Sequence, residues 1–170
     1  MNDALRTHRC HWLWLGLAVV IVIADQITKL LALKHLQLHQ PLPVFPSFDL
    51  MLTYNRGAAF SFLSNAGGWQ RWLFIALAIG ISIFLVKWLF SLRAEERWLA
   101  AALALVTGGA VGNLLDRVFR DGQVVDFVYL HYQNFHWPAF NLADSSICVG
   151  AVILVAQSLW GAASGRESTQ

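Results

Sequence analysis

Four long apolar stretches constrain what this chain of 170 residues can fold into. They cover about residues 12–33, 69–89, 98–115 and 141–160. A helix needs about 20 predominantly apolar residues to cross the hydrocarbon core of a bilayer, which is about 30 Å thick. Each stretch has roughly that length, so the sequence predicts a single integral membrane domain, residues 1–170, with four spanning helices.

The amino-acid composition supports a membrane protein and excludes several other classes. Hydrophobic residues make up 57% of the chain and charged residues 13%, whereas a soluble domain carries about 25% charged residues. The net charge of +2 is too small and too dispersed to predict nucleic-acid binding. Cys10 and Cys148 form no motif typical of a disulfide framework or a zinc site.

The first apolar stretch could also be a cleavable signal peptide. Arg6 and Arg9 precede it, and residues 22–24 resemble a small-residue cleavage site. The apolar pattern nevertheless continues through Leu33, and three further stretches follow. A retained first span is therefore the simpler interpretation.

An even number of spans places both termini on the same side of the membrane. Lys and Arg are enriched on the cytoplasmic side, but six of them fall on each side of the predicted membrane. The charge count therefore does not decide the orientation. We expect cytoplasmic termini, because several basic residues on the other side resemble parts of a site.

Two connections on the same side of the membrane contain strand-like segments. The run Phe48–Tyr54 is strand-like, and the run Val124–Tyr129 is rich in β-branched and aromatic residues. We expect a small sheet at one mouth of the bundle, with Val124, Asp126 and Val128 on one face. Residues 64–72 predict a short interfacial helix, with two tryptophans at headgroup level.

Charged side chains near a membrane face are candidates for function, because they are costly there. Asp25 and Lys29 are four residues apart and can form an ion pair on one helical face. For this pair a structural role is the better interpretation. On the third stretch, Asn113, Asp116 and Arg117 share one face, and a structural ion cluster and a functional site are equally plausible.

The third stretch also contains a GxxxG motif at Gly108 and Gly112. Small residues at this spacing let two helices approach closely in lipid. The motif is common, so it predicts close helix packing and no particular activity.

Asp126 and Asp144 are the candidates for catalysis. Asn141 resembles the N-cap of the fourth helix, which places Asp144 at the third helical position. Each aspartate alone has an ordinary explanation, as a solvated strand residue and as a capping carboxylate. Together they could activate one water molecule: an ionised aspartate accepts its proton while a protonated aspartate polarises a scissile amide. Because a helix N-terminus favours an anion at Asp144, we expect Asp126 to be protonated.

Other chemistries and functions are less well supported. The chain has no HExxH and no GxSxG motif, although His131 and His136 could bind a metal together with Asp126. Cys148 is more typical of a packing residue than of a nucleophile. A proton-coupled transporter or channel and a non-catalytic assembly subunit are the alternatives to a hydrolase.

Five sequence blocks, in order from the first span to the last, resemble the bacterial lipoprotein signal peptidases, also called signal peptidase II. The resemblance covers about residues 12–161. The blocks are Asp25-Gln-Ile-Thr-Lys29, Asn55-Arg-Gly-Ala-Ala-Phe60, Gly108-Gly-Ala-Val-Gly-Asn113 leading to Asp116-Arg117, Val124-Val-Asp126-Phe127, and Phe140-Asn-Leu-Ala-Asp144.

The resemblance implies an aspartyl endopeptidase of the bacterial inner membrane, with cytoplasmic termini and an active site near the periplasmic face. Its implied substrates are diacylglyceryl-modified prolipoproteins, cut just before the lipidated cysteine. Membrane lipids and globomycin-type cyclic lipopeptide inhibitors are implied as partners, and no metal or other cofactor is implied.

The resemblance also assigns roles to individual positions. Asp126 and Asp144 correspond to the catalytic pair of the family. The remaining positions are polar or small residues implied to support the substrate or the structure. Those near the substrate are Asn55, Gly57, Asn113, Arg117 and Asn141, and those with a structural role are Asp25, Lys29 and Asp116.

Overall fold

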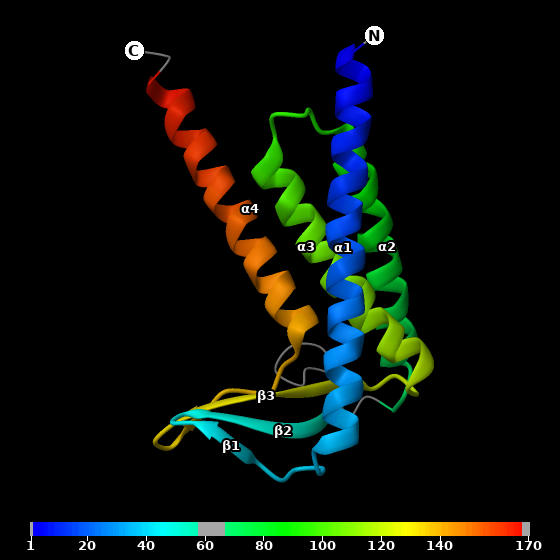
Figure 1. The fold of residues 1–170 in the computed structure, drawn as a ribbon, viewed down its shortest axis with the longest axis vertical. Coiled ribbons are helices and arrows are strands. Elements are labelled where there is room, and N and C mark those ends of the chain that lie inside the picture. Colours follow the sequence, from blue (N-terminus) through cyan, green and yellow to red (C-terminus); the bar gives the residue numbers. More distant parts are fainter. Residues whose placement is uncertain (1, 58–66, 168–170) are drawn as a thin grey trace.

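The structure is a bundle of four helices with a small sheet at one end (Figure 1). The computed structural model describes residues 2–57 and 67–167, and side chains within 11–57 and 67–160. The helices are α1 (Asn2–His35), α2 (Gln70–Ser91), α3 (Arg97–Phe119) and α4 (Leu142–Glu167). Both termini lie at the end of the bundle opposite the sheet. This architecture confirms the fold expected from the sequence.

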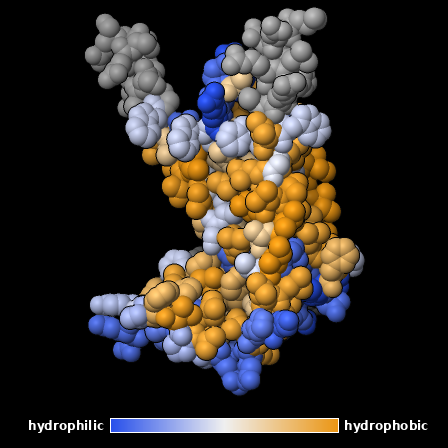
Figure 2. Space-filling view, viewed as in Figure 1, coloured by the Kyte–Doolittle hydropathy of each residue, from blue (hydrophilic) through white to orange (hydrophobic). Residues whose placement is uncertain are grey.

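All four helices are long and apolar enough to cross a membrane. Helix α3 is the central one: half of its most apolar segment is buried, against 22%, 11% and 17% in α1, α2 and α4. It packs against the other three helices. Figure 2 shows an apolar surface along most of the bundle, which suits contact with lipid tails because all backbone groups of a helix are paired internally.

Exposed tryptophans lie at both ends of the bundle. Trp12, Trp98 and Trp160 are at the end that carries the termini, and Trp69 and Trp72 at the sheet end. Tryptophan is enriched at membrane interfaces, so the two sets fit the two faces of a bilayer.

The short helix expected over residues 64–72 is only partly within the described chain. Residues 64–66 lie outside the described residues. Gly67, Gly68 and Trp69 form a turn, and Gln70 already begins α2. Both tryptophans of this segment are exposed, as expected for an interfacial position.

Glycines of α3 allow close contact with α1 and α4. A methyl group added at Gly108 would lie 2.8 Å from the carbonyl oxygen of Ala18 in α1. One added at Gly109 would overlap the carbonyl oxygen of Ala143 in α4. The GxxxG motif therefore packs helices as predicted, with Gly109 beside it serving the second neighbour.

The sheet has four antiparallel strands in the order β1 (Leu42–Phe45), β2 (Phe48–Asn55), β3 (Val124–Tyr132) and β4 (Phe135–His136). The two predicted strands correspond to β2 and β3, and β3 continues three residues further. Strands β1 and β4 were not expected. Strand β1 contains Pro43 and lies at the edge of the sheet, where a missing N–H is tolerated.

The start of β3 is enclosed on both faces. Asn55 pairs with Val124 and Thr53 with Asp126, so the end of β2 lies beside the start of β3. Val124, Val125 and Asp126 are all at most 2% exposed. Burial here does not alternate as in a half-exposed strand, because β3 contacts α1 and α3 as well as β2.

We predict that Gly109→Ala lowers the melting temperature in detergent, because the new methyl group would push α4 away from α3. Gly80→Ala in α2 is the matched control, since nothing lies within 4 Å of the added methyl group. Alanine is favoured over glycine in a helix by about 0.5–1 kcal/mol, so the control should melt at the same or a higher temperature. Equal effects of both substitutions would contradict close packing at Gly109.

Candidate active site

The start of α4 is organised by a reciprocal cap. The Asp144 backbone N–H donates to Asn141 Oδ1 at 2.9 Å, and the Asn141 N–H donates to Asp144 Oδ2 at 3.3 Å. This is the arrangement of a capping box, with Asn141 at the N-cap and Asp144 three residues later. The predicted cap is confirmed, and it directs the Asp144 carboxylate to the sheet end of the bundle.

Asp126 lies on β3 next to this cap. Its Oδ1 accepts a 2.7 Å hydrogen bond from Asn141 Nδ2, and the Asn55 side chain also bonds it. Burial, and then the nearby charge of Asp144, raise the pKa of Asp126 to about 7. An aspartate with such a pKa is protonated over much of the range below neutrality.

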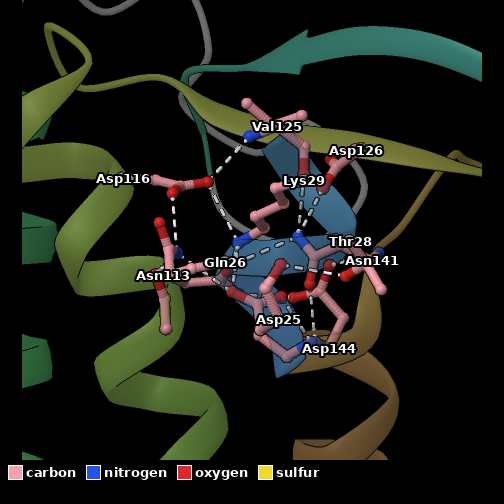
Figure 3. A network of polar contacts seen from close by, with 12 residues as sticks. Asp25, Gln26, Thr28, Lys29, Asn113, Asp116, Val125, Asp126, Asn141 and Asp144 are labelled. Atoms are coloured by element: carbon pink, nitrogen blue, oxygen red, sulfur yellow. Dashed lines mark hydrogen bonds and ion pairs between the residues drawn. The ribbon is translucent and has the colours of Figure 1, made fainter. Parts of the chain in front are cut away.

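Asn113 of α3 joins the two aspartates to the rest of the bundle (Figure 3). Its Nδ2 donates to Asp144 Oδ1 at 2.7 Å. Its Oδ1 accepts from Asn141 Nδ2 at 3.1 Å and from Lys29 Nζ at 2.9 Å. Asn141 therefore bonds both aspartates, and Asn113 bonds Asp144 and Asn141, so that both carboxylates belong to one network.

Lys29 extends this network, because the lysine lies between two carboxylates as well as bonding Asn113. Its Nζ is 2.9 Å from Asp25 and 3.0 Å from Asp116, and all three side chains are fully buried. Asp25 also accepts from the Ala143 N–H, and Asp116 from the Val125 N–H, each at 3.0 Å. These two backbone bonds connect the ion cluster to the residues that directly precede Asp144 and Asp126 in the chain.

Arg117 connects α3 to the turn after β2. Its Nη2 donates to the Gly57 carbonyl at 2.9 Å, and its guanidinium carbon lies 5.2 Å from the centre of the Phe74 ring. The Gly57 N–H in turn donates to Asn55 Oδ1 at 2.9 Å. This places a cation and several backbone groups beside the aspartates, where a peptide could be oriented.

The structure brings all the site residues expected from the sequence into this region, from α1, the end of β2, α3, β3 and the start of α4. Two further polar residues join them that sequence reasoning did not single out. Gln26 donates to Asp116 Oδ1 at 3.0 Å, and Arg120 forms an ion pair with the same oxygen. The spacing of Asp116 and Arg120, four residues on one helix, was the signal that could have indicated this pair.

The two histidines considered as possible metal ligands, His131 and His136, have partners other than Asp126. His131 pairs with Asp49 at 3.2 Å, and His136 bonds the Tyr129 hydroxyl at 2.8 Å. His131 is five positions along β3 from Asp126 and faces the other side of the strand. Within residues 2–57 and 67–167, no cluster of three or more His, Cys, Asp or Glu side chains is arranged to hold a metal ion.

Four apolar helices with a cluster of polar side chains at one end, including buried Asp126 and partly buried Asp144, are typical of an integral membrane protein. The sequence model of the signal peptidase II family matches residues 17–160. The chain belongs to this family of peptidases, which confirms the resemblance seen in the five sequence blocks.

Similar proteins agree with this assignment. The chain is 49% identical to the lipoprotein signal peptidase of Pseudomonas aeruginosa, over 99% of both chains. It is 51% identical to that of Teredinibacter turnerae, over 87% of this chain and 88% of the relative. A solved bacterial membrane enzyme structure, determined by the in meso method at 2.3 Å resolution, has a TM-score of 0.77 at 31% identity. That match covers 86% of this chain and 87% of the other.

We predict that Lys29→Met strongly destabilises the protein, because it leaves Asp25 and Asp116 buried without their shared cation. Removing one partner of a buried ion pair costs about 3–5 kcal/mol. Lys34→Met, on the exposed side of the same helix, is the matched control. Melting curves in detergent measure both, and equal melting temperatures would show that Lys29 is not required for the fold.

Proposed function

We propose that this protein is an aspartyl endopeptidase that removes the signal peptide from diacylglyceryl-modified prolipoproteins. The observation that carries the proposal is that Asn141 bonds both Asp126 and Asp144, while Asn113 bonds Asp144 and Asn141. The names of the relatives, lipoprotein signal peptidases, support the substrate class. The cut falls just before the lipidated cysteine.

In the proposed reaction the two aspartates have different protonation states. Ionised Asp144 accepts a proton from water, and the hydroxide oxygen attacks the scissile carbonyl carbon. Protonated Asp126 donates its proton to the carbonyl oxygen, giving a neutral tetrahedral diol. When the C–N bond breaks, the proton on Asp144 passes to the amine of the cysteine, and a diol proton returns to Asp126. The products are a carboxylic acid and an amine, and both aspartates regain their starting states.

The remaining polar residues orient the substrate and the aspartates. Arg117, already bonded to the Gly57 carbonyl, can hold substrate carbonyls close to the scissile bond. Asn55 and Asn141 bond Asp126, and Asn113 bonds Asp144. Such fixed orientation lowers the entropy cost of reaching the transition state. The reaction requires no metal or other cofactor.

The proposed site is at the membrane surface, which suits a substrate that cannot leave the bilayer. Both termini lie at the opposite end of the bundle. We place that end in the cytoplasm and the site at the periplasmic face of the inner membrane. Membrane lipids surround the bundle, and globomycin-type lipopeptides are inhibitors that would occupy the same site.

We predict that Asp126→Asn and Asp144→Asn each abolish cleavage, because each removes one of the two proton-transfer groups. The substitutions are isosteric, so the variants should melt close to wild type. The measurement is the shortening of a diacylglyceryl-modified prolipoprotein by purified protein in detergent, followed on a gel with and without a metal chelator.

The same assay separates the competing functions. Cleavage by the wild type alone, unaffected by chelator, supports the two-aspartate mechanism. An active single variant, folded like the wild type, would rule that mechanism out. A well-folded wild type that cuts nothing would favour the transporter or assembly-subunit alternatives.

We also predict that kcat/KM falls as pH rises above about 7, the pKa of Asp126. The sign follows from the mechanism: Asp126 acts as a proton donor, and its protonated form is lost above its pKa. A pH–rate profile with the lipidated substrate measures this limb. Activity that stays constant to well above pH 8 would contradict the role of Asp126 as the acid.

A further inference from the structure

Besides Lys29 and the Val125 backbone N–H, Asp116 has a second set of partners. Gln26 Nε2 donates to Asp116 Oδ1 at 3.0 Å, to the Gly112 carbonyl at 3.1 Å and to Asp25 Oδ2 at 3.2 Å. Arg120 pairs with Asp116 Oδ1 and also donates to Gln26 Oε1 at 3.3 Å. One oxygen of Asp116 is thus held from two sides by an amide and a guanidinium.

The other oxygen of Asp116 faces the catalytic region. Oδ2 lies 3.0 Å from Lys29 Nζ and accepts the Val125 backbone N–H at 3.0 Å. Val125 directly precedes Asp126 on β3, and Figure 3 shows Asp116 reaching toward this strand. A rotation of the Asp116 carboxylate would therefore move the anchor of the strand that carries Asp126.

Arg120 is one of the cations that balance the negative charges around Asp116. Asp25 and Asp116 are the two acids of the cluster, and Lys29 and Arg120 are its two cations. Arg117 interacts electrostatically with Asp144 and Asp126 first, and to a smaller extent with Asp116. Without Arg120 the cluster would lose one of its positive charges next to the aspartate pair, in surroundings where charge is weakly screened.

We propose that Gln26 and Arg120 are positioning residues for Asp126. They hold the Asp116 carboxylate so that its Oδ2 accepts the Val125 N–H and fixes the start of β3. Arg120 also contributes a positive charge to the ion cluster next to the two aspartates. This inference rests on the proposed function. It assigns Gln26 and Arg120 no contact with substrate, so their effect on the reaction passes through Asp116.

A purely structural role predicts a different outcome. If Arg120 and Gln26 only secured the sheet end of α3, their loss would lower stability and the amount of folded enzyme. The pH dependence of the activity of the protein that remains folded would then be unchanged. A positioning and charge-balancing role alters kcat and the pH profile of protein that is fully folded.

The test compares Arg120→Gln, Arg120→Lys and Gln26→Met with wild type, in the prolipoprotein cleavage assay across pH. Arg120→Gln removes the charge, Arg120→Lys keeps it, and Gln26→Met removes the amide without changing charge. Arg97→Gln is the control, because Arg97 is exposed at the opposite end of α3. Melting curves for every variant give the folded fraction at the assay temperature.

We expect Arg120→Gln to move both limbs of the pH profile upward by about half a unit, because lost positive charge favours protonated carboxylates. This is less than the roughly one to three units caused by a charge in direct contact. Arg120→Lys should restore the wild-type profile. Gln26→Met should lower kcat about tenfold or more without a pH shift, since small misplacements cost up to about 100-fold. Arg97→Gln should match wild type.

Two results would overturn the inference while leaving the proposed function intact. One is an active wild type whose pH profile is unchanged in folded Arg120→Gln. The other is a Gln26→Met variant with wild-type kcat. If Arg120→Gln does not fold, the other two variants decide. A shifted pH profile in Arg120→Lys would contradict the proposal, and so would an unchanged kcat in Gln26→Met. A wild type that cuts nothing would instead remove the proposed function itself.

Discussion

The buried ion cluster around Lys29 is the interaction on which the arrangement of the site depends. A charge placed away from water is tolerated only if it is paired and its remaining hydrogen-bonding positions are filled. Lys29 meets this requirement with Asp25, Asp116 and the Asn113 side chain. Each carboxylate then uses another oxygen lone pair to hold the backbone at Ala143 or Val125. The requirement to neutralise one lysine thus connects α1, α3, α4 and β3.

This connection explains how two aspartates distant in the chain share one network at the sheet end of the bundle. Asp144 is positioned by a helix cap and Asp126 by a strand, and the two elements are fastened to the same cluster. The close approach of α3 to α4 at Gly109 brings the cap within reach of Asn113. Burial then raises the pKa of Asp126 to about 7, so that this carboxyl group can hold a proton close to neutral pH.

Much of the fold and site could be predicted from local patterns. The four spans, the two longer strands and the Asn141 cap depend on hydrophobicity, β-branched residues and a capping motif, which act within a few residues. Strands β1 and β4 were not predicted, because a segment with prolines and a two-residue strand acquire their pairing only from β2 and β3. Gln26 was missed for a related reason, because its partner Asp116 lies near it only after α1 packs against α3. For Arg120 the four-residue spacing from Asp116 was a local signal.

The sequence by itself determined that the protein spans a membrane with four helices, that its acids gather toward one face, and that it resembles signal peptidase II. These properties follow from composition and from motifs whose residues are close in the chain. Only the tertiary structure decided which acids share a network, that Lys29 lies between two carboxylates, and that Asp126 is buried enough for its pKa to be raised. The physical reason is that charge pairing and desolvation depend on distances between helices and strands, which no single segment encodes.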